Sequence, residues 1–377
     1  VSSGDTLDLN GQRAEFSGAF DLNGSLDLDG SLAIFKHTLD LGGKYPSAGL
    51  ESDADTIIIH DPPSTSEKAI TSLYAQGTFF AKGAESEVTG YAWGGGSTQQ
   101  PTNIFVGGKL DCQQNTSSTE NITVATGGEL LGTDRTLTVG GDFTTSGGLL
   151  GASAIDLNGS QQHYSTVSAV AVGTNSAWTI EGWMKRDDGS SGNQVFVELK
   201  TASNNNNRVW VNIDTDDVQM LIYSNGGSLG LAATANQGLN DGKWHHIAVT
   251  YDSTTCQIYV DGKLTTSEVI SKTVDNTDDR IINVGANVGT YANEFTGAID
   301  EVRIWSDVRT EAEIRANMFS EVSSGDGLVQ NWRFNEGTGD TASANVGTSL
   351  NARVGGNSAS SQSASLWAGA GTFTYGT

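Results

Sequence analysis

The sequence predicts an all-β protein in which a repetitive, β-solenoid-like region precedes an antiparallel two-sheet sandwich. Apolar and polar residues alternate over short runs, glycine is abundant (48 residues) and proline is rare (4). Many short strands joined by tight glycine turns produce this pattern, whereas long helices need apolar residues at a 3.6-residue period. Every tryptophan except Trp93 lies beyond residue 152. The chain therefore divides into a glycine-rich region, residues 1–151, and an aromatic-rich region, residues 152–377.

A short phrase repeats in the first region. Two apolar residues flank one polar residue, and a glycine turn follows, at 6–11, 19–24, 25–30 and 38–43. The phrase returns with steps of 18 residues from Ile104 to Ile122, 15 from Ile122 to Leu137 and 18 from Leu137 to Ile155. Such steps are close to one coil of a solenoid, whose coils stack to form a core. Antiparallel hairpins are the alternative, and residues 44–100 interrupt the repeat.

The second region contains strand, turn and helix signals in order. Alternating apolar residues predict strands at 154–164, 178–185, 244–252, 257–260 and 298–305. Asp261-Gly262 predicts a two-residue hairpin turn, and a slip of phase at Asp300-Glu301 predicts a β-bulge. The segment 310–319 is the one clear helical pattern, with Thr310 as its N-cap and Glu311 and Glu313 in the first turn.

Three motifs in this region resemble a known family. They are WHHIAVTYD from Trp244, IYVDGKL from Ile258 and FTGAIDEVRIWSDVRTEAEI from Phe295. Together with the strands at 154–164 and 178–185 they resemble the laminin-G-like, concanavalin A-like jelly roll across residues 152–318. The resemblance implies a two-sheet antiparallel sandwich and, by itself, no activity.

Two further expectations concern how this sandwich is built. A phrase that usually precedes the jelly roll in the family follows it here, from Gly327 to Gly339. We therefore expect residues 328–367 to close the same sandwich beside the strand at 154–164, as in a permuted chain. Large aromatic residues suit the space between two sheets. We expect four of them to share that interior: Trp178, Trp183, Trp244 and Trp305.

The composition limits the partners. The formal net charge is −24, which predicts no binding to nucleic acid or to an anionic membrane surface. No apolar run is long enough to span a bilayer, so we expect no membrane insertion. The chain starts at Val1 without a signal segment, which suggests a fragment or a processed product of a longer protein.

Aromatic residues give the candidate ligand-binding positions. Exposed aromatic rings on a jelly-roll face stack against sugar rings, and the candidates are Trp210, Tyr223 and Tyr291. No catalytic residue is assigned. His245 and His246 are adjacent in one strand without a recognised nucleophile motif, so we expect structural roles, with one side chain facing the core and the other facing solvent.

Calcium is the metal that the acidic clusters favour, because it prefers carboxylate, amide and carbonyl oxygens. The candidate ligands are Asp214, Asp216, Asp278 and Asp300. Aspartate and asparagine also form ordinary solvated turns, and that alternative stays open.

Together these observations favour a non-enzymatic, surface-displayed structural or adhesion protein, located outside the cell or on a virion. The style of the repeats resembles that of virion decoration or appendage proteins of tailed phages, and of bacterial adhesins. We expect a glycan or a surface protein as the partner, with self-association or attachment to a larger assembly. The alternatives are a bacterial adhesin or a carbohydrate-binding module of a larger secreted protein, and an enzyme that degrades polysaccharides.

Overall fold

The structure is a computed structural model. It describes residues 6–22, 25–36, 39–40, 49–52, 55–62, 69–72, 76–83, 85–88, 101–112, 116–118, 121–132, 137–139, 141, 143–160, 162–166, 168–172, 177–201, 204–224, 228–270, 279–287, 293–354, 366–368 and 372–375.

The chain forms two compact units, and the second is inserted into the first. The first unit comprises residues 1–149 and 369–377, and the second comprises residues 150–368. Residues 369–377, which the sequence analysis places with the sandwich, join the first unit because β36 (Thr372–Tyr375) pairs in parallel with β16 (Glu129–Gly132).

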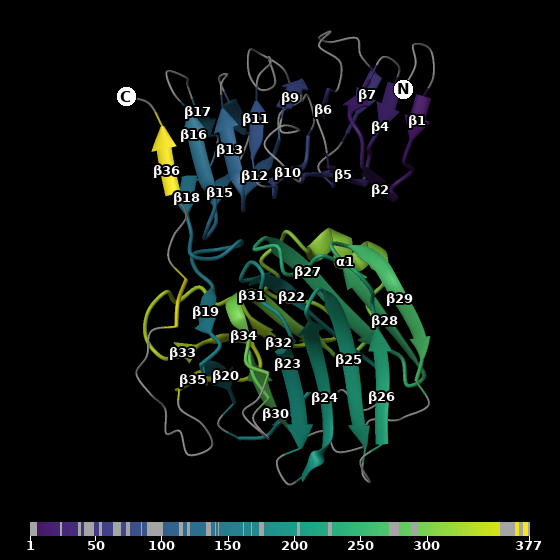
Figure 1. Cartoon of the computed structure of the whole chain (residues 1–377), viewed down its shortest axis with the longest axis vertical. Helices are drawn as coiled ribbons and strands as arrows, with labels where there is room; N and C mark the ends of the chain where they lie inside the picture. Colours follow the sequence, from purple (N-terminus) through teal and green to yellow (C-terminus); the bar gives the residue numbers. More distant parts are fainter. Residues whose placement is uncertain are drawn as a thin grey trace. The chain divides into compact units, whose positions relative to one another are not determined.

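The first unit is a β-solenoid in which all the described strand pairings are parallel, as expected from the repeats (Figure 1). One seven-stranded sheet contains β2 (Arg13–Phe16), β5 (Leu32–Phe35), β8 (Ile57–His60), β10 (Thr78–Ala81), β12 (Asn103–Val106), β15 (Ile122–Val124) and β18 (Phe143–Thr145). A second contains β3 (Phe20–Asp21), β6 (Leu39–Asp40), β9 (Ala69–Ser72), β11 (Ser86–Val88), β13 (Lys109–Cys112), β16 and β36. Two smaller sheets contain β1 (Thr6–Asp8), β4 (Ser25–Asp27) and β7 (Gly49–Glu51), and β14 (Thr116–Ser118) and β17 (Leu137–Val139).

The register corrects two of the three predicted coil steps. Ile104 pairs with Ile122 as predicted, but Ile122 then pairs with Phe143, whereas Leu137 pairs with Thr116 in another sheet. The step from Leu137 to Ile155 is also wrong, because Ile155 pairs in antiparallel orientation with Ile299 in the second unit. Each coil contains more than one strand, and similar phrases form different faces, so spacing alone could not identify the partner. Strands β7 to β11 keep parallel pairing within residues 44–100, so the interruption there affects the sequence pattern and not the stacking.

Stacked apolar side chains form the core of the solenoid. Ile58, Phe79, Ile104 and Ile122 occupy matching positions in successive strands, and each is about 1% exposed. A strand of three or four residues buries little surface by itself, so the stack supplies the apolar burial that stabilises each coil.

The second unit is an antiparallel sandwich of two sheets (Figure 1). The eight-stranded sheet contains β19 (Ile155–Asn158), β22 (Trp178–Arg186), β27 (Trp244–Tyr251), β28 (Thr255–Val260), β29 (Lys263–Val269), β31 (Thr296–Trp305), β32 (Leu328–Trp332) and β34 (Ala344–Val346). The nine-stranded sheet contains β20 (Gln162–Ser165), β21 (Val170–Ala171), β23 (Asn193–Thr201), β24 (Asn204–Asp214), β25 (Asp217–Ser224), β26 (Ser228–Ala233), β30 (Asp279–Val284), β33 (Thr341–Ala342) and β35 (Leu350–Val354).

The C-terminal strands close this sandwich, which confirms the expectation for residues 328–367. β32 pairs with β31 in the eight-stranded sheet, and β35 pairs with β20 in the nine-stranded sheet. Ile155 forms a further bridge with Trp367. Backbone hydrogen bonds depend on strand position and not on chain order, so strands at the end of the region complete sheets that begin near residue 155.

The prediction that four tryptophans share one interior is wrong. Trp178 belongs to the apolar cluster between the sheets, together with Ile180 and Met184 of the same strand. Trp183 has the opposite parity on β22 and therefore points to the other face of the eight-stranded sheet. Trp244 and Trp305 lie on that other face by the same alternation. All four are at most 1% exposed, because that face is also covered.

Three local predictions are confirmed. Asp261 and Gly262 have φ of 48° and 70° between β28 and β29, as a type I′ turn requires. The pairing of β31 with β22 shifts at residues 300–301, where Glu301 has φ of 51°. Helix α1 (Glu311–Asn317) begins with a capping box formed by Thr310 and Glu313. Within the described part of the chain, no helix is both long and apolar enough to cross a membrane.

The sandwich core gives the first prediction. Ile258 is completely buried between the sheets, and Ile258→Ala should lower the free energy of unfolding by about 2–5 kcal/mol through lost burial and a cavity. Val269→Ala, at a side chain that is 81% exposed, should change it by no more than about 0.5 kcal/mol. Urea unfolding followed by tryptophan fluorescence measures both, because all tryptophans except Trp93 lie in the second unit. Equal effects would contradict the assignment of Ile258 to the core.

Candidate functional site

The outer face of the nine-stranded sheet carries the aromatic residues that the sequence singled out. On β24 and β25, Val209, Val211 and Ile222 point into the core between the sheets. Successive side chains of a strand point to opposite faces, so Arg208, Trp210 and Tyr223 point outward. Arg208 pairs with Tyr223 across the two strands, and Trp210 pairs with Leu221.

The three outward side chains form one group. The Trp210 and Tyr223 rings meet edge to face, with centroids 5.2 Å apart. The guanidinium carbon of Arg208 lies 3.9 Å from the centroid of the Trp210 ring and 4.4 Å from that of the Tyr223 ring. A cation over an aromatic face is attracted by the ring quadrupole, and the attraction reaches about 2 kcal/mol when the pair is desolvated. The arginine and the two rings therefore stabilise one another.

A chain of buried hydrogen bonds on the same face orients Trp210 from the neighbouring strands. Its indole Nε1 donates to Oε1 of Glu198 at 2.6 Å, and Oε2 of Glu198 accepts from Nδ2 of Asn283 at 2.7 Å. The hydroxyl of Ser165 then donates to Oδ1 of Asn283 at 2.7 Å. Glu198 and Asn283 are completely buried, so this chain of polar contacts is held in a low dielectric and fixes the indole in place.

Leucines extend this group toward the edge of the sheet. Leu221 pairs with Leu231 of the edge strand β26, and Leu231 is 49% exposed. We call Arg208, Trp210, Leu221, Tyr223 and Leu231 the outer-face patch. It combines apolar surface, two aromatic rings and a cation.

The structure brings together two of the three predicted ligand-binding residues. Trp210 is only 6% exposed, so it mainly supports Arg208 and Tyr223. Tyr223 is half-buried and is the more exposed of the two rings. Tyr291 lies outside the described residues. Arg208 was not among the predicted residues, because its place opposite Tyr223 depends on a strand register that the sequence did not predict.

The acidic turn proposed for calcium is built around an arginine. Asp214 and Asp216 flank the turn between β24 and β25, and Arg186 donates hydrogen bonds to the carbonyl oxygens of Thr215 and Gly192. Burial lowers the pKa of Arg186, and the two aspartates act in the opposite direction. The guanidinium thus supplies positive charge to this acidic turn.

The other two calcium candidates are apart from this turn. Asp300 is completely buried, and its Oδ2 accepts a hydrogen bond from the backbone N–H of Leu150 at 3.0 Å. Asp278 lies outside the described residues. Among the residues that the structure describes, no group of three or more histidine, cysteine or acidic side chains is placed to hold a metal. Calcium binding stays a prediction.

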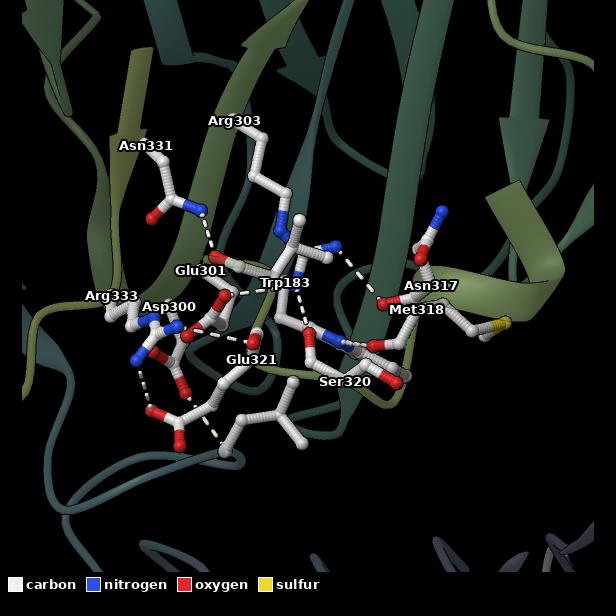
Figure 2. Close-up of polar contacts among 12 residues, drawn as sticks. Trp183, Asp300, Glu301, Arg303, Asn317, Met318, Ser320, Glu321, Asn331 and Arg333 are labelled. Carbon is white, nitrogen blue, oxygen red and sulfur yellow. Dashed lines mark hydrogen bonds and ion pairs between the residues drawn. The ribbon is translucent and has the colours of Figure 1, made fainter. Parts of the chain in front are cut away.

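A second polar cluster lies on the outer face of the eight-stranded sheet, and helix α1 and the segment after it cover it. Arg303 forms ion pairs with Glu301 at 2.8 Å and with Glu181 at 3.5 Å. It also donates to the carbonyl oxygens of Asn317, at 3.0 Å, and Ser320 (Figure 2). One guanidinium therefore joins two sheet carboxylates to the segment after α1.

Neighbouring side chains hold the same segment. The indole Nε1 of Trp183 donates to the Met318 carbonyl at 2.6 Å, and Nδ2 of Asn331 donates to the Val322 carbonyl at 2.7 Å (Figure 2). Glu181, Glu301 and Arg303 are each at most 1% exposed. Since a ligand cannot reach them in this arrangement, we assign this cluster to packing.

The prediction that one of the two histidine side chains faces solvent is wrong. Neither side chain faces solvent: His245 is 4% exposed and contacts Asp261 and Asp241, and His246 is 1% exposed. Burial lowers the pKa of His246 to about 4, and Glu181, 3.6 Å away, opposes this shift. Burial raises the pKa of Glu301 to about 7, and the Arg303 guanidinium, 2.8 Å away, opposes this shift.

Comparison with known proteins supports the fold of the sandwich. Residues 158–315 match the family model of the concanavalin A-like lectin/glucanases superfamily, which confirms the resemblance over that segment. A search of the curated proteins finds no match.

Three solved structures match parts of the chain at low identity and low TM-score. A Bacteroides ovatus protein, described provisionally as carbohydrate-binding, is 18% identical with a TM-score of 0.42; the match covers 60% of this chain and 63% of that one, less than two thirds of its length. The CBM40 of Ruminococcus gnavus IT-sialidase, bound to alpha2,3 sialyllactose, is 16% identical (TM-score 0.35; 43% and 94% covered). Domains LG4-5 of the mouse laminin alpha1 chain are 19% identical (TM-score 0.33; 41% of each chain covered).

The lowered pKa of His246 predicts how the stability of the protein changes with pH. The pKa of His246 is lowered on folding, so protonation favours the unfolded chain, and the stability that its neutral form contributes is present above pH 6.5 and lost as pH falls toward 4. Relative to His246→Gln, the parent should lose about 3 kcal/mol of unfolding free energy between pH 6.5 and 4. Urea titrations of both proteins across this range measure the difference. A difference that does not vary with pH would contradict burial of a neutral imidazole.

The raised pKa of Glu301 predicts that stability changes with pH in the opposite direction. Its pKa is raised on folding, so its contribution to stability is present below pH 4.5 and is lost as pH rises toward 7. The stability of the parent relative to Glu301→Gln should therefore fall as pH rises from 4.5 to 7. The same titrations test this, and a difference that grows with pH would show that Arg303 outweighs burial at this carboxyl.

Proposed function

We propose that the sandwich is a carbohydrate-binding module that acts by adhesion, without catalysis, and that it binds a glycan through the outer-face patch. The observation that carries this proposal is the grouping of Tyr223, Trp210 and Arg208 on the outer face of the nine-stranded sheet. Sugar rings pack their apolar faces on aromatic rings and direct their hydroxyls to neighbouring polar groups.

The rigidity of the patch supports this assignment. The Glu198 carboxylate fixes Trp210, and Trp210 and Arg208 in turn hold Tyr223 in one orientation. A preorganised ring loses little conformational freedom on binding, which favours affinity for a small sugar epitope. The family that residues 158–315 match is named for lectins and glucanases, two classes of protein that contact carbohydrate.

We infer that the module is displayed outside the cell, on a virion appendage of a tailed phage or, as the alternative, on a bacterial surface. The inserted arrangement supports this setting: a solenoid of short repeats carries the sandwich between β18 and β36, so the chain ties the module to its scaffold at both ends. A scaffold of stacked coils also suits attachment to a larger assembly.

The patch predicts the effect of removing its open ring. Tyr223→Ala should weaken binding to the best glycan of an array by at least about tenfold, as expected for an aromatic residue at the centre of a binding surface. Tyr223→Phe should bind within a few-fold of the parent, because it keeps the ring. Val269→Ala, on the edge strand β29 of the other sheet, should bind as the parent does. Failure of the parent to bind any glycan would refute the proposed function.

The proposed setting has its own test. Antibodies against the sandwich should label the exterior of intact virions or cells when the native source is imaged by electron microscopy. Labelling confined to the interior would contradict surface display and leave the glycan-binding proposal to the array.

A further inference from the structure

Arg208 differs from the other arginines that the structure describes. Five arginines lie within 4 Å of a carboxylate: Arg13, Arg303, Arg309, Arg315 and Arg333. Arg186 donates three hydrogen bonds to neutral oxygens, and Arg280 donates to the carbonyl oxygen of Asn207. Within the described part of the chain, Arg208 contacts only the rings of Trp210 and Tyr223, and its Nε is buried without a hydrogen-bond partner.

Arg208 has no carboxylate partner among the residues that the structure describes, although the chain contains 44 acidic and only 20 basic residues. The nearest acidic residue on the same face is Glu198, which pairs across the strands with Trp210. Its two oxygens accept hydrogen bonds from the Trp210 indole and the Asn283 amide, and it forms no ion pair with Arg208. The patch thus keeps a cation beside a carboxylate without joining the two.

The geometry leaves the guanidinium ready for a ligand. The guanidinium lies over the faces of both rings and its Nε is buried, so its two terminal NH₂ groups are the donors that can meet a ligand. This fork matches the two oxygens of a carboxylate, with two parallel charge-assisted hydrogen bonds. Tyr223, directly across the strands, provides a ring beside it for the body of a sugar.

We propose that the ligand of the outer-face patch is an acidic glycan, in which a sugar carboxylate binds the Arg208 guanidinium while the sugar ring packs on Tyr223. This inference rests on the proposed function and specifies its ligand class. Because Glu198 accepts its hydrogen bond from Trp210, this carboxylate is not paired with Arg208, and the guanidinium stays available to the sugar carboxylate.

The net charge of −24 does not oppose such binding at physiological ionic strength. Exposed charges more than about 8 Å apart are largely screened at 0.15 M salt. Asp214 is six residues from Arg208 along β24, a distance of about 20 Å for extended backbone at 3.3 Å per residue.

The test uses the whole chain and an array of carboxylated, sulfated and neutral glycans, followed by titration of each carboxylated binder against its carboxyl methyl ester. The ester keeps the sugar and removes the charge. We expect the carboxylated glycan to bind about 10- to 100-fold more tightly than its ester, the range that charge-assisted hydrogen bonds supply. Arg208→Gln should lose the same factor for the acid and leave the affinity for the ester unchanged.

Matched variants keep the test specific. Arg309→Gln removes an arginine that is also stacked on a tryptophan, Trp305, at 4.3 Å, but that already pairs with Asp307 and Glu313; binding should be unchanged. Arg208→Lys keeps the charge without the fork and should recover only part of the affinity. Urea midpoints of the variants report whether the sandwich is intact.

Three results would overturn this inference. Equal affinity for acid and ester, or binding of neutral or sulfated glycans alone, would refute a carboxylate at Arg208 while leaving glycan binding in place. Arg208→Gln with parental affinity for the acid in a folded protein would do the same. No binding to any glycan would refute the proposed function together with this inference.

Discussion

The burial of both faces of the eight-stranded sheet is the constraint on which the rest of the sandwich depends. One face packs on the second sheet, and α1 with the segment after it covers the other. Polar groups on a covered face must be paired, because a buried charge without a partner costs several kcal/mol. Arg303 meets this requirement by bonding Glu181, Glu301 and the carbonyl oxygens after α1. The outer face of the nine-stranded sheet carries a half-buried arginine and tyrosine beside an exposed leucine, next to the buried Glu198 and Asn283.

Local patterns predicted the elements well, and long-range pairing poorly. The Asp261-Gly262 turn, the bulge at Glu301 and the capping box of Thr310 each depend on a few neighbouring residues, and each is confirmed. Alternation shows that Trp178 and Trp183 face opposite ways, but it cannot show which face is covered, or by what. The step from Ile122 to Leu137 failed for a related reason, since similar phrases recur on several strands of one coil.

The candidate site was predictable in its residue types and not in its arrangement. Aromatic residues on a jelly-roll strand identified Trp210 and Tyr223, and their placement on adjacent strands brings the rings to 5.2 Å. The aspartates chosen for calcium show the limit of composition: Asp300 serves a backbone N–H, and Asp214 and Asp216 share a turn with Arg186. Those roles depend on residues more than 25 positions away, which no local pattern contains.

The hydrogen bonds of Glu198 determine whether Arg208 has a carboxylate partner on the outer face. Had its carboxylate bonded Arg208, the patch would hold a neutral pair and an indole with an unpaired N–H, which is costly when buried. Instead the carboxylate satisfies two neutral donors, Trp210 Nε1 and Asn283 Nδ2, and the guanidinium is held by the rings alone. The same stacked arrangement at Arg309 and Trp305 is completed by Asp307 and Glu313, which neutralise that arginine. Of these two arginine–tryptophan pairs, only the pair at Arg309 has carboxylate partners among the described residues, and that difference makes Arg208 the cation suited to an external anion.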